Sequence, residues 1–220
     1  MTTEQPAAPQ PVGPISGPSS ADSTALQIRA PKQYKPAASS ASGSPPLEWL
    51  HRTWTVTHST LKRWRPAQNL TITYGAHPAS AAGNPRITDV VAYQSKGSTK
   101  VKSISGVDTA VSKDDLTSWN WRGGGLLKPI SCPWEMIGWG ERVNSEGVTE
   151  RWAVTWFAKT LFTEEGLDIY TDRYEGMSEE LAGLILEALG KLGVPSLEKL
   201  VAQKMEKVAI DLASKPGPKA

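Results

Sequence analysis

The stretch RTWTVTHST, residues 52–60, alternates larger side chains with small hydroxylated ones. Successive side chains of an extended strand point to opposite sides. Trp54, Val56 and His58 therefore share one face, and the threonines between them share the other. This period of two, with many β-branched residues, is typical of a half-buried β-strand. The stretch NLTITY, residues 69–74, repeats the pattern.

Similar short segments follow these two stretches at near-regular spacing. Further strands are expected at residues 87–95, 100–107, 119–122, 126–130, 133–140, 150–161 and 166–173. Glycine-containing turns separate several of them, and Gly123-Gly124-Gly125 favours a hairpin. The polar stretch 107–118 is expected to be a loop. About nine strands at this spacing indicate an all-β barrel or sandwich.

The first 46 residues differ from this middle part in composition. They are rich in Pro, Ala, Ser and Gly, with almost no large apolar side chains. Such a segment cannot bury enough surface to offset its conformational entropy. We therefore expect residues 1–46 to be a disordered tail and residues 47–175 to be the barrel.

The residues after Gly176 favour helices instead of strands. Ser178 is a suitable N-cap for a first helix, and Ser196 for a second one. The apolar stripe of the second helix is expected to run from Leu197 to Leu212. Because each stripe needs a partner, residues 176–213 are expected to pack on the barrel as two helices. Residues 214–220 are expected to form a flexible end.

Composition argues against several classes of protein. The net charge is +2, and the Lys and Arg residues are scattered. No basic stripe for nucleic acid is therefore predicted. There is no apolar run long enough to span a membrane and no signal-peptide pattern. With Cys132 as the single cysteine, these features favour a reducing, cytoplasmic compartment. Metal ligands at a useful spacing are also lacking, and no metal site is expected.

Four stretches of the chain carry a resemblance to known proteins: LHRTWTVTHSTL, WNWRGGGLLK, PWEMIGWG and WAVTWFAKTLFTEEGLDIYTDR. They resemble a group of lipocalin-like proteins from fungi, within the calycin superfamily that includes the lipocalins and fatty-acid-binding proteins. The resemblance covers most of residues 47–213. It implies a mainly β fold, an antiparallel up-and-down β-barrel in which Trp54 closes one end. The glycine that usually precedes this tryptophan is replaced by Arg52. The resemblance implies no particular activity.

Nitrobindins, haem-binding barrels of the same broad group, use a histidine from a late strand as the iron ligand. This chain has no histidine after His77. Haem is therefore disfavoured, and no cofactor is expected.

Nine tryptophans against two phenylalanines are the most unusual feature of the composition. One interpretation is core packing, because indole rings bury a large area. The other is an aromatic-lined cavity, since an eight-stranded barrel either fills its interior or holds one small ligand. The candidate ligand-binding residues are Trp54, His58, Trp119, Trp121, Trp134, Trp152 and Trp156. A register shift of one residue would invert these assignments.

The leading hypothesis is that the barrel binds or carries a small, mainly apolar ligand. A second hypothesis is an enzyme on the same scaffold, an isomerase or cyclase of a small hydrophobic metabolite, with His58 or Tyr74 as acid–base. Such catalysis through positioning needs no recognisable motif. A third is a protein-interaction module that uses the C-terminal helices. The sequence determines neither the ligand nor the oligomeric state.

Overall fold

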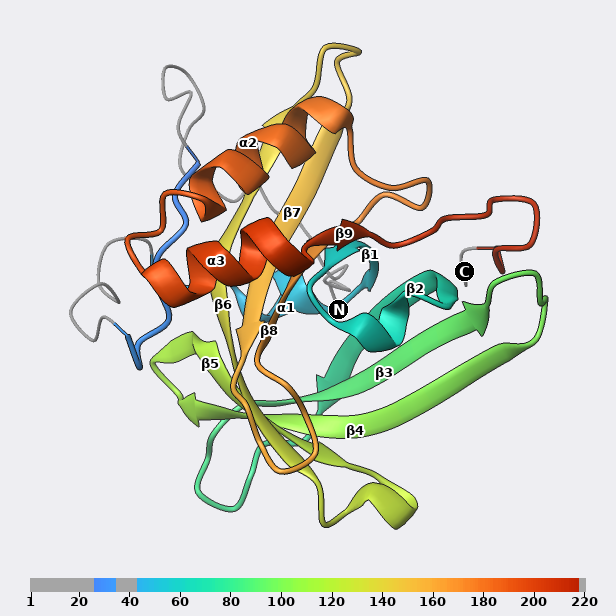
Figure 1. Ribbon diagram of the computed structural model, residues 1–220. Helices are drawn as coiled ribbons and strands as arrows, with labels where there is room; N and C mark the ends of the chain where they lie inside the picture. The colour runs from blue at the N-terminus through green and yellow to red at the C-terminus, as the bar shows by residue number, and fades with distance from the viewer. Residues whose placement is uncertain (1–25, 35–42, 218–220) are drawn as a thin grey trace, which may run out of the picture.

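The computed structural model describes residues 26–34 and 43–217. Strands hold more of them than helices do (Figure 1). The helical elements are α1 (Leu47–Leu50), η2 (Lys62–Trp64), η3 (Gly125–Leu127), α2 (Glu179–Leu189) and α3 (Pro195–Lys204). The strands are β1 (Thr53–Ser59), β2 (Ala67–His77), β3 (Arg86–Ser95), β4 (Val101–Ser112), β5 (Asp115–Gly123), β6 (Ser131–Val143), β7 (Thr149–Phe157), β8 (Gly166–Thr171) and β9 (Glu206–Lys207).

Strands β1 to β8 form a closed antiparallel barrel. Each strand pairs with the next along the chain, and β1 pairs with both β2 and β8. This up-and-down order confirms the predicted fold class. Closure leaves no free edge in the barrel itself, and β9 adds only a short pairing to the end of β1.

The barrel is closed at the end where β1 begins. The short helix α1 precedes β1, and the indole N–H of Trp54 donates to the Leu50 carbonyl at 3.1 Å. Trp54 and Leu50 are at most 1% exposed. Trp49 packs on Trp54 with ring centroids 4.8 Å apart, and the Arg52 guanidinium lies over both rings. The prediction that Trp54 closes one end of the barrel is thus consistent with its position.

Two local predictions were wrong at the hairpins. Residues 107–118, expected as a loop, form the end of β4 and the start of β5, joined by a turn at Lys113 and Asp114. The polar inner side chain of Asp108 hid this strand from the apolar pattern. Residues 126–130 are not a strand, because η3 and a turn connect β5 to β6.

Helices α2 and α3 lie across the outer face of β7 and β8 (Figure 1). Ser178 caps α2 as predicted, its hydroxyl accepting from the Leu181 amide at 3.3 Å. The apolar faces of both helices pack against Trp152, Val154 and Trp156. Because these faces are covered by the barrel, they are not free surfaces for a partner. No helix in the described part of the chain is long and apolar enough to cross a membrane.

The second helix is shorter than expected and ends at Lys204. The chain then extends along the barrel, and the Val208 amide donates to the Thr57 carbonyl at 2.8 Å. Strand pairing thus replaces the helical hydrogen bonds that the apolar stripe predicted. The described part of the predicted flexible end, residues 214–217, is also held. Ser214 accepts from Gln68 and Asn69, and Lys215 is 8% exposed.

Part of the predicted disordered tail packs on the barrel. Ile28 forms a β-bridge to Gly138, and Ala30 is buried. The Arg29 guanidinium pairs with Glu135 at 2.7 Å and donates to Thr117 at 3.1 Å. The prediction therefore needs correction for residues 26–34, whose ion pair the composition could not reveal. Residues 1–25 and 35–42 of that predicted tail lie outside the described residues.

Candidate functional site

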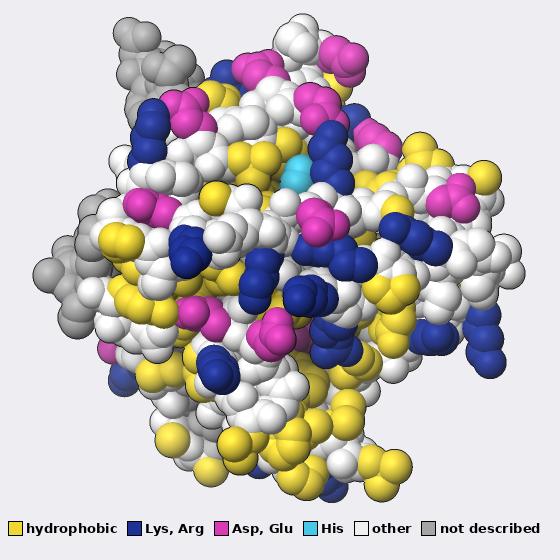
Figure 2. Space-filling view, in the orientation of Figure 1, with side chains coloured by type: hydrophobic (Ala, Val, Ile, Leu, Met, Phe, Trp, Pro, Cys, Tyr) yellow, Lys and Arg dark blue, Asp and Glu magenta, His cyan; other side chains and the backbone are white. Residues whose placement is uncertain are grey.

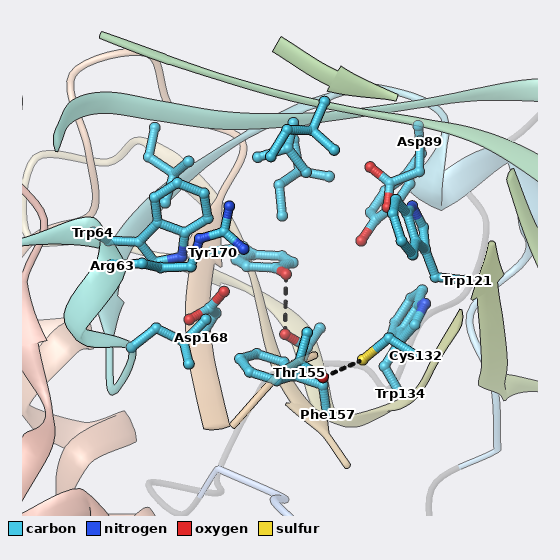
Figure 3. Close-up of a pocket in the computed structure, with 17 residues that line it drawn as sticks. Arg63, Trp64, Asp89, Trp121, Cys132, Trp134, Thr155, Phe157, Asp168 and Tyr170 are labelled. Carbon is cyan, nitrogen blue, oxygen red and sulfur yellow. Dashed lines mark hydrogen bonds between the residues drawn. The ribbon is translucent and has the colours of Figure 1, made fainter. Parts of the chain in front are cut away.

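A cavity of about 160 Å³ lies inside the barrel (Figure 3). Its wall is mainly aliphatic and aromatic, with a few polar groups. The lining residues are Leu61, Arg63, Trp64, Leu70, Ile72, Tyr74, Asp89, Val91, Ile104, Trp121, Cys132, Trp134, Thr155, Phe157, Thr163, Asp168 and Tyr170. They come from β2 to β8 and from the connections after β1 and β7.

Stacked rings separate this cavity from the closed end of the barrel. The Trp134 ring stacks between Tyr74 and Trp119, with both centroid distances at 5.9 Å. Trp119 is fully buried, and its indole N–H donates to the Leu116 carbonyl at 2.8 Å. Trp134 and Tyr74 therefore line the cavity, while Trp119 fills the interior next to them.

The Trp121 indole lies against Gly106 of β4, where the absence of a side chain makes room for it. A Cβ atom at Gly106 would lie 2.4 Å from the Trp121 indole nitrogen. Since carbon and nitrogen cannot approach so closely, any larger residue at Gly106 would displace Trp121. The ring thereby lies beside Asp89, which pairs with Gly106 across the strands. Figure 3 shows Asp89 and Trp121 on the same side of the cavity.

Asp89 and Asp108 form a buried acidic pair. Asp89 is 7% exposed and Asp108 is fully buried. The Trp134 indole N–H donates to Asp108 Oδ1 at 2.7 Å, but Asp89 Oδ1 and Asp108 Oδ2 have no hydrogen-bond partner. Burial raises the pKa of Asp89 to about 7. Burial, together with the charge of Asp89, raises the pKa of Asp108 well above its usual value.

Asp168 enters the cavity from the opposite side, on β8 (Figure 3). It is 5% exposed, and its Oδ1 has no hydrogen-bond partner. Burial raises the pKa of Asp168 to about 7, although the nearby charges of Arg63 and Arg65 oppose this rise. Next to it, Thr155 Oγ1 donates to the Tyr170 hydroxyl at 3.0 Å. Strongly shifted acids in a cavity are typical of functional sites.

The cavity approaches the surface between η2 and the β7–β8 connection. A surface depression there is lined by Leu61, Lys62, Arg63, Phe162, Thr163 and Glu164. Three of these residues also line the cavity. Leu126 and Leu161 are 99% and 95% exposed on neighbouring loops. Figure 2 shows apolar side chains gathered at this end of the molecule. The mouth therefore combines exposed apolar side chains with the charged groups of Lys62, Arg63 and Glu164.

Cys132 lies in the cavity wall near this mouth. Its sulfur lies 3.7 Å from Thr163 Oγ1 (Figure 3). Burial raises the pKa of the Cys132 thiol, so the thiolate that reacts as a nucleophile is disfavoured. Within the described residues, no group of three or more His, Cys, Asp or Glu side chains could hold a metal ion.

The seven predicted ligand-binding residues lie in three different places. Trp121 and Trp134 line the cavity. Trp54 and Trp119 face the same interior but fill it at the closed end. Trp152 and Trp156 do share a face, as predicted, but that face is the outer one, under α2 and α3. A ligand-binding role inside the barrel is therefore open to Trp121 and Trp134 and not to the outer pair.

His58 points to the outside, although alternation placed it with Trp54 and Val56. A β-bulge between Val56 and His58 shifts the register, so that Val56 pairs with Tyr170 and His58 with Ile169. A bulge adds one residue to a strand and inverts the faces beyond it. His58 Nδ1 lies 3.1 Å from Thr57 Oγ1, and burial lowers the pKa of the imidazole. Its position excludes acid–base catalysis by His58 in the cavity, whereas Tyr74 does line it.

The sequence-based prediction missed Trp64, Asp89 and Asp168. Asp89 carried a signal, because in the stretch ITDVVAY it lies on the same face as Ile87 and Val91. An acid on the apolar face of a strand needs either a partner or a function. Asp168 gave a weaker signal, since apolar residues on β8 lie on the outer face.

Comparison with protein-family models and with curated protein sequences gives no match. Comparison with solved structures does give matches. Lobster apocrustacyanin A1 has a TM-score of 0.51 and 7% identity, over 86% of this chain and 91% of that chain. Apocrustacyanin C1 has a TM-score of 0.52 and 8% identity, over 85% and 89%. The chain therefore has the lipocalin, or calycin, fold. At this identity the likeness concerns the fold alone.

Proposed function

We propose that the protein binds a small, mainly apolar ligand inside its barrel, against Trp64, Trp121 and Trp134. The observation that carries this proposal is the cavity of about 160 Å³, whose lining is mainly aliphatic and aromatic. Apolar cavities of about 150 Å³ bind a benzene-sized molecule. The lipocalin architecture supports it further, since eight-stranded barrels of this kind hold one small ligand. A ligand with a single aromatic ring fits this size.

The contribution of the walls to affinity is mainly burial of apolar surface, at about 25 cal/mol per Å². The polar groups then orient the ligand, as in most small-molecule sites. Tyr74, Asp89 and Asp168 present oxygen atoms to the cavity. Burial raises the pKa of Tyr74 well above its usual value, so its hydroxyl stays a donor near neutral pH.

A cavity-filling substitution tests the proposal. Val91→Phe adds bulk to a residue that lines the cavity, so it is expected to lower the affinity for propylbenzene about tenfold or more. Isothermal titration calorimetry measures this affinity. Val111→Phe is the matched control, because Val111 is 66% exposed on the outside of β4. It is expected to leave the affinity unchanged.

Tryptophan fluorescence tests whether the ligand binds inside the barrel. Ligand binding is expected to change the emission of Trp121, and Trp121→Phe to remove most of that change. Trp152→Phe, on the outer face, is expected to leave it in place. If propylbenzene shows no saturable binding and Val91→Phe only raises the melting temperature, the cavity is a packing void and the proposal is wrong.

A further inference from the structure

The acids on the two sides of the cavity differ in whether cationic side chains lie near them. Arg63 is the one cationic side chain among the described lining residues. The positive charges of Arg63 and Arg65 favour the ionised form of Asp168 and lower its pKa. On the other side, Asp89 and Asp108 share a hydrogen bond with each other, and the Trp134 indole N–H donates to Asp108. Two carboxyl oxygens on that side, Asp89 Oδ1 and Asp108 Oδ2, have no partner.

An unpartnered carboxyl group in an apolar site is costly. Leaving a buried acceptor without a donor costs about 1–3 kcal/mol, and more for a charged group. Asp89 is 7% exposed and lies in the cavity wall itself. A ligand group that donates hydrogen bonds there would therefore recover an interaction that the folded protein alone lacks.

The surroundings of Asp89 favour a positively charged donor. The Trp121 ring lies over Gly106, which pairs with Asp89 across the strands. Tyr74 pairs with Asp89 on the other neighbouring strand. Faces of aromatic rings attract cations. A neutral hydroxyl would satisfy one oxygen without meeting the negative charge, and a carboxylate would be repelled by it.

We propose that the ligand is a small apolar amine whose ammonium group binds Asp89 beside Trp121, with its apolar body against Val91 and Ile104. An ammonium group supplies a positive charge and three N–H donors. This inference rests on the proposed function, because it describes the occupant of the same cavity. It also sets a selectivity, since the acidic pair excludes anions such as fatty acids.

Three probes of similar shape test the charge. They are phenethylamine, propylbenzene and 3-phenylpropanoate, which end in an ammonium, a methyl and a carboxylate group. Calorimetry on the full chain near neutral pH is expected to show phenethylamine binding about tenfold or more tighter than propylbenzene, since hydrogen bonds to charged groups are strong. The carboxylate is expected not to bind. Equal affinity for the amine and propylbenzene, or preference for the carboxylate, would overturn the inference.

The substitution Asp89→Asn tests whether Asp89 is the group that binds the ammonium. It is expected to lower the affinity for phenethylamine about tenfold and to leave that for propylbenzene nearly unchanged. Asp114→Asn is the matched control, the same substitution at an exposed aspartate in the turn between β4 and β5, outside the cavity lining. It is expected to keep the preference for the amine. If Asp89→Asn does not fold, Asp89→Leu makes the same comparison with an apolar side chain of similar size.

The outcomes separate this inference from the proposed function. If propylbenzene binds the wild type but the amine is not preferred, the inference fails and the proposed function stands. If neither probe binds, both fail. If the amine is preferred equally by the wild type and the Asp89 variants, Asp89 is not its binding group and the inference fails.

Discussion

The two faces of strands β7 and β8 differ in polarity, and the outer face is the more apolar one. The outer face, under α2 and α3, carries Trp152, Val154, Trp156, Leu167 and Ile169, all at most 3% exposed. The inner face of the same strands includes Thr155, Asp168 and Tyr170, which line the cavity. The more apolar face of this wall is therefore outside the barrel, where the helices pack.

The two faces also differ in what they contribute to stability. The outer face buries large side chains against the helices. The inner face holds an acid whose pKa burial raises to about 7. Destabilising groups of this kind are kept where a function needs them. We therefore propose that the outer face provides stability and that the inner one binds the ligand, and substitutions on each face test this division.

Trp156→Ala on the outer face is expected to have the largest effect on stability. It removes a ring that is 3% exposed, packs on Tyr34 and donates to Glu165 at 2.9 Å. Loss of a buried aromatic side chain costs about 3–5 kcal/mol, measured by urea denaturation. Trp121→Ala is the inner counterpart, expected to cost less stability and more ligand affinity. The reverse ranking would contradict the division between the faces.

Asp168→Asn is expected to have a pH-dependent effect of about 2–4 kcal/mol. Because the pKa of Asp168 is about 7 in the fold and lower in the unfolded chain, the native state binds the extra proton. Wild-type stability therefore falls as pH rises from about 4 to 7. The Asn variant has no carboxyl group to titrate there, so it does not lose stability in this way. Its stability relative to the wild type should therefore increase from about pH 4 to 7 and stay constant at higher pH.

Urea denaturation of both proteins across this pH range measures the difference. The comparison with the variant is needed because His58 also titrates in this range. Burial lowers the pKa of His58, so its contribution makes stability rise with pH, opposite to that of Asp168. Subtracting the two proteins removes the His58 contribution. A pH-independent difference would mean that Asp168 titrates normally in the fold.

Arg29→Ala tests the segment 26–34, which packs on the outside of the barrel. Arg29 and Glu135 pair with both side chains 11% exposed, so the substitution leaves Glu135 without its cation. A cost of about 1.5–3 kcal/mol is expected, with faster proteolysis at residues 26–34. Lys207→Ala, whose pair with Glu179 is exposed, serves as the control and is expected to cost about 0–1 kcal/mol.

Alkylation of Cys132 should show the smallest effect. It is the single cysteine of the chain and lies in the cavity wall. Bound propylbenzene is expected to slow its reaction with iodoacetamide a few-fold, followed by mass spectrometry. A cysteine at Val111 in a Cys132→Ser background is the exposed control, and its rate should not respond to the ligand. Protection of both thiols, or of neither, would argue against binding in the cavity.

Part of the site was readable from the sequence. Strand alternation placed Trp119 and Trp121 on one face, and both do face the interior. Alternation also placed Trp152 and Trp156 together, but it contains no information about which face is inside when both are buried. Asp108 went unnoticed because its strand was interpreted as a polar loop.

The sequence by itself determined the rhythm of most strands and the presence of two helices after Gly176. These follow from local periodicity, which the chain expresses residue by residue. The up-and-down order of the barrel was implied by the resemblance to lipocalin-like proteins. Only the tertiary structure decided that His58 points outward, because one bulge beyond Val56 inverts the strand. It also decided that the helices cover β7 and β8, and that Asp89 and Asp108 meet beside Trp121. These facts depend on pairings between segments distant in sequence, which no local pattern specifies.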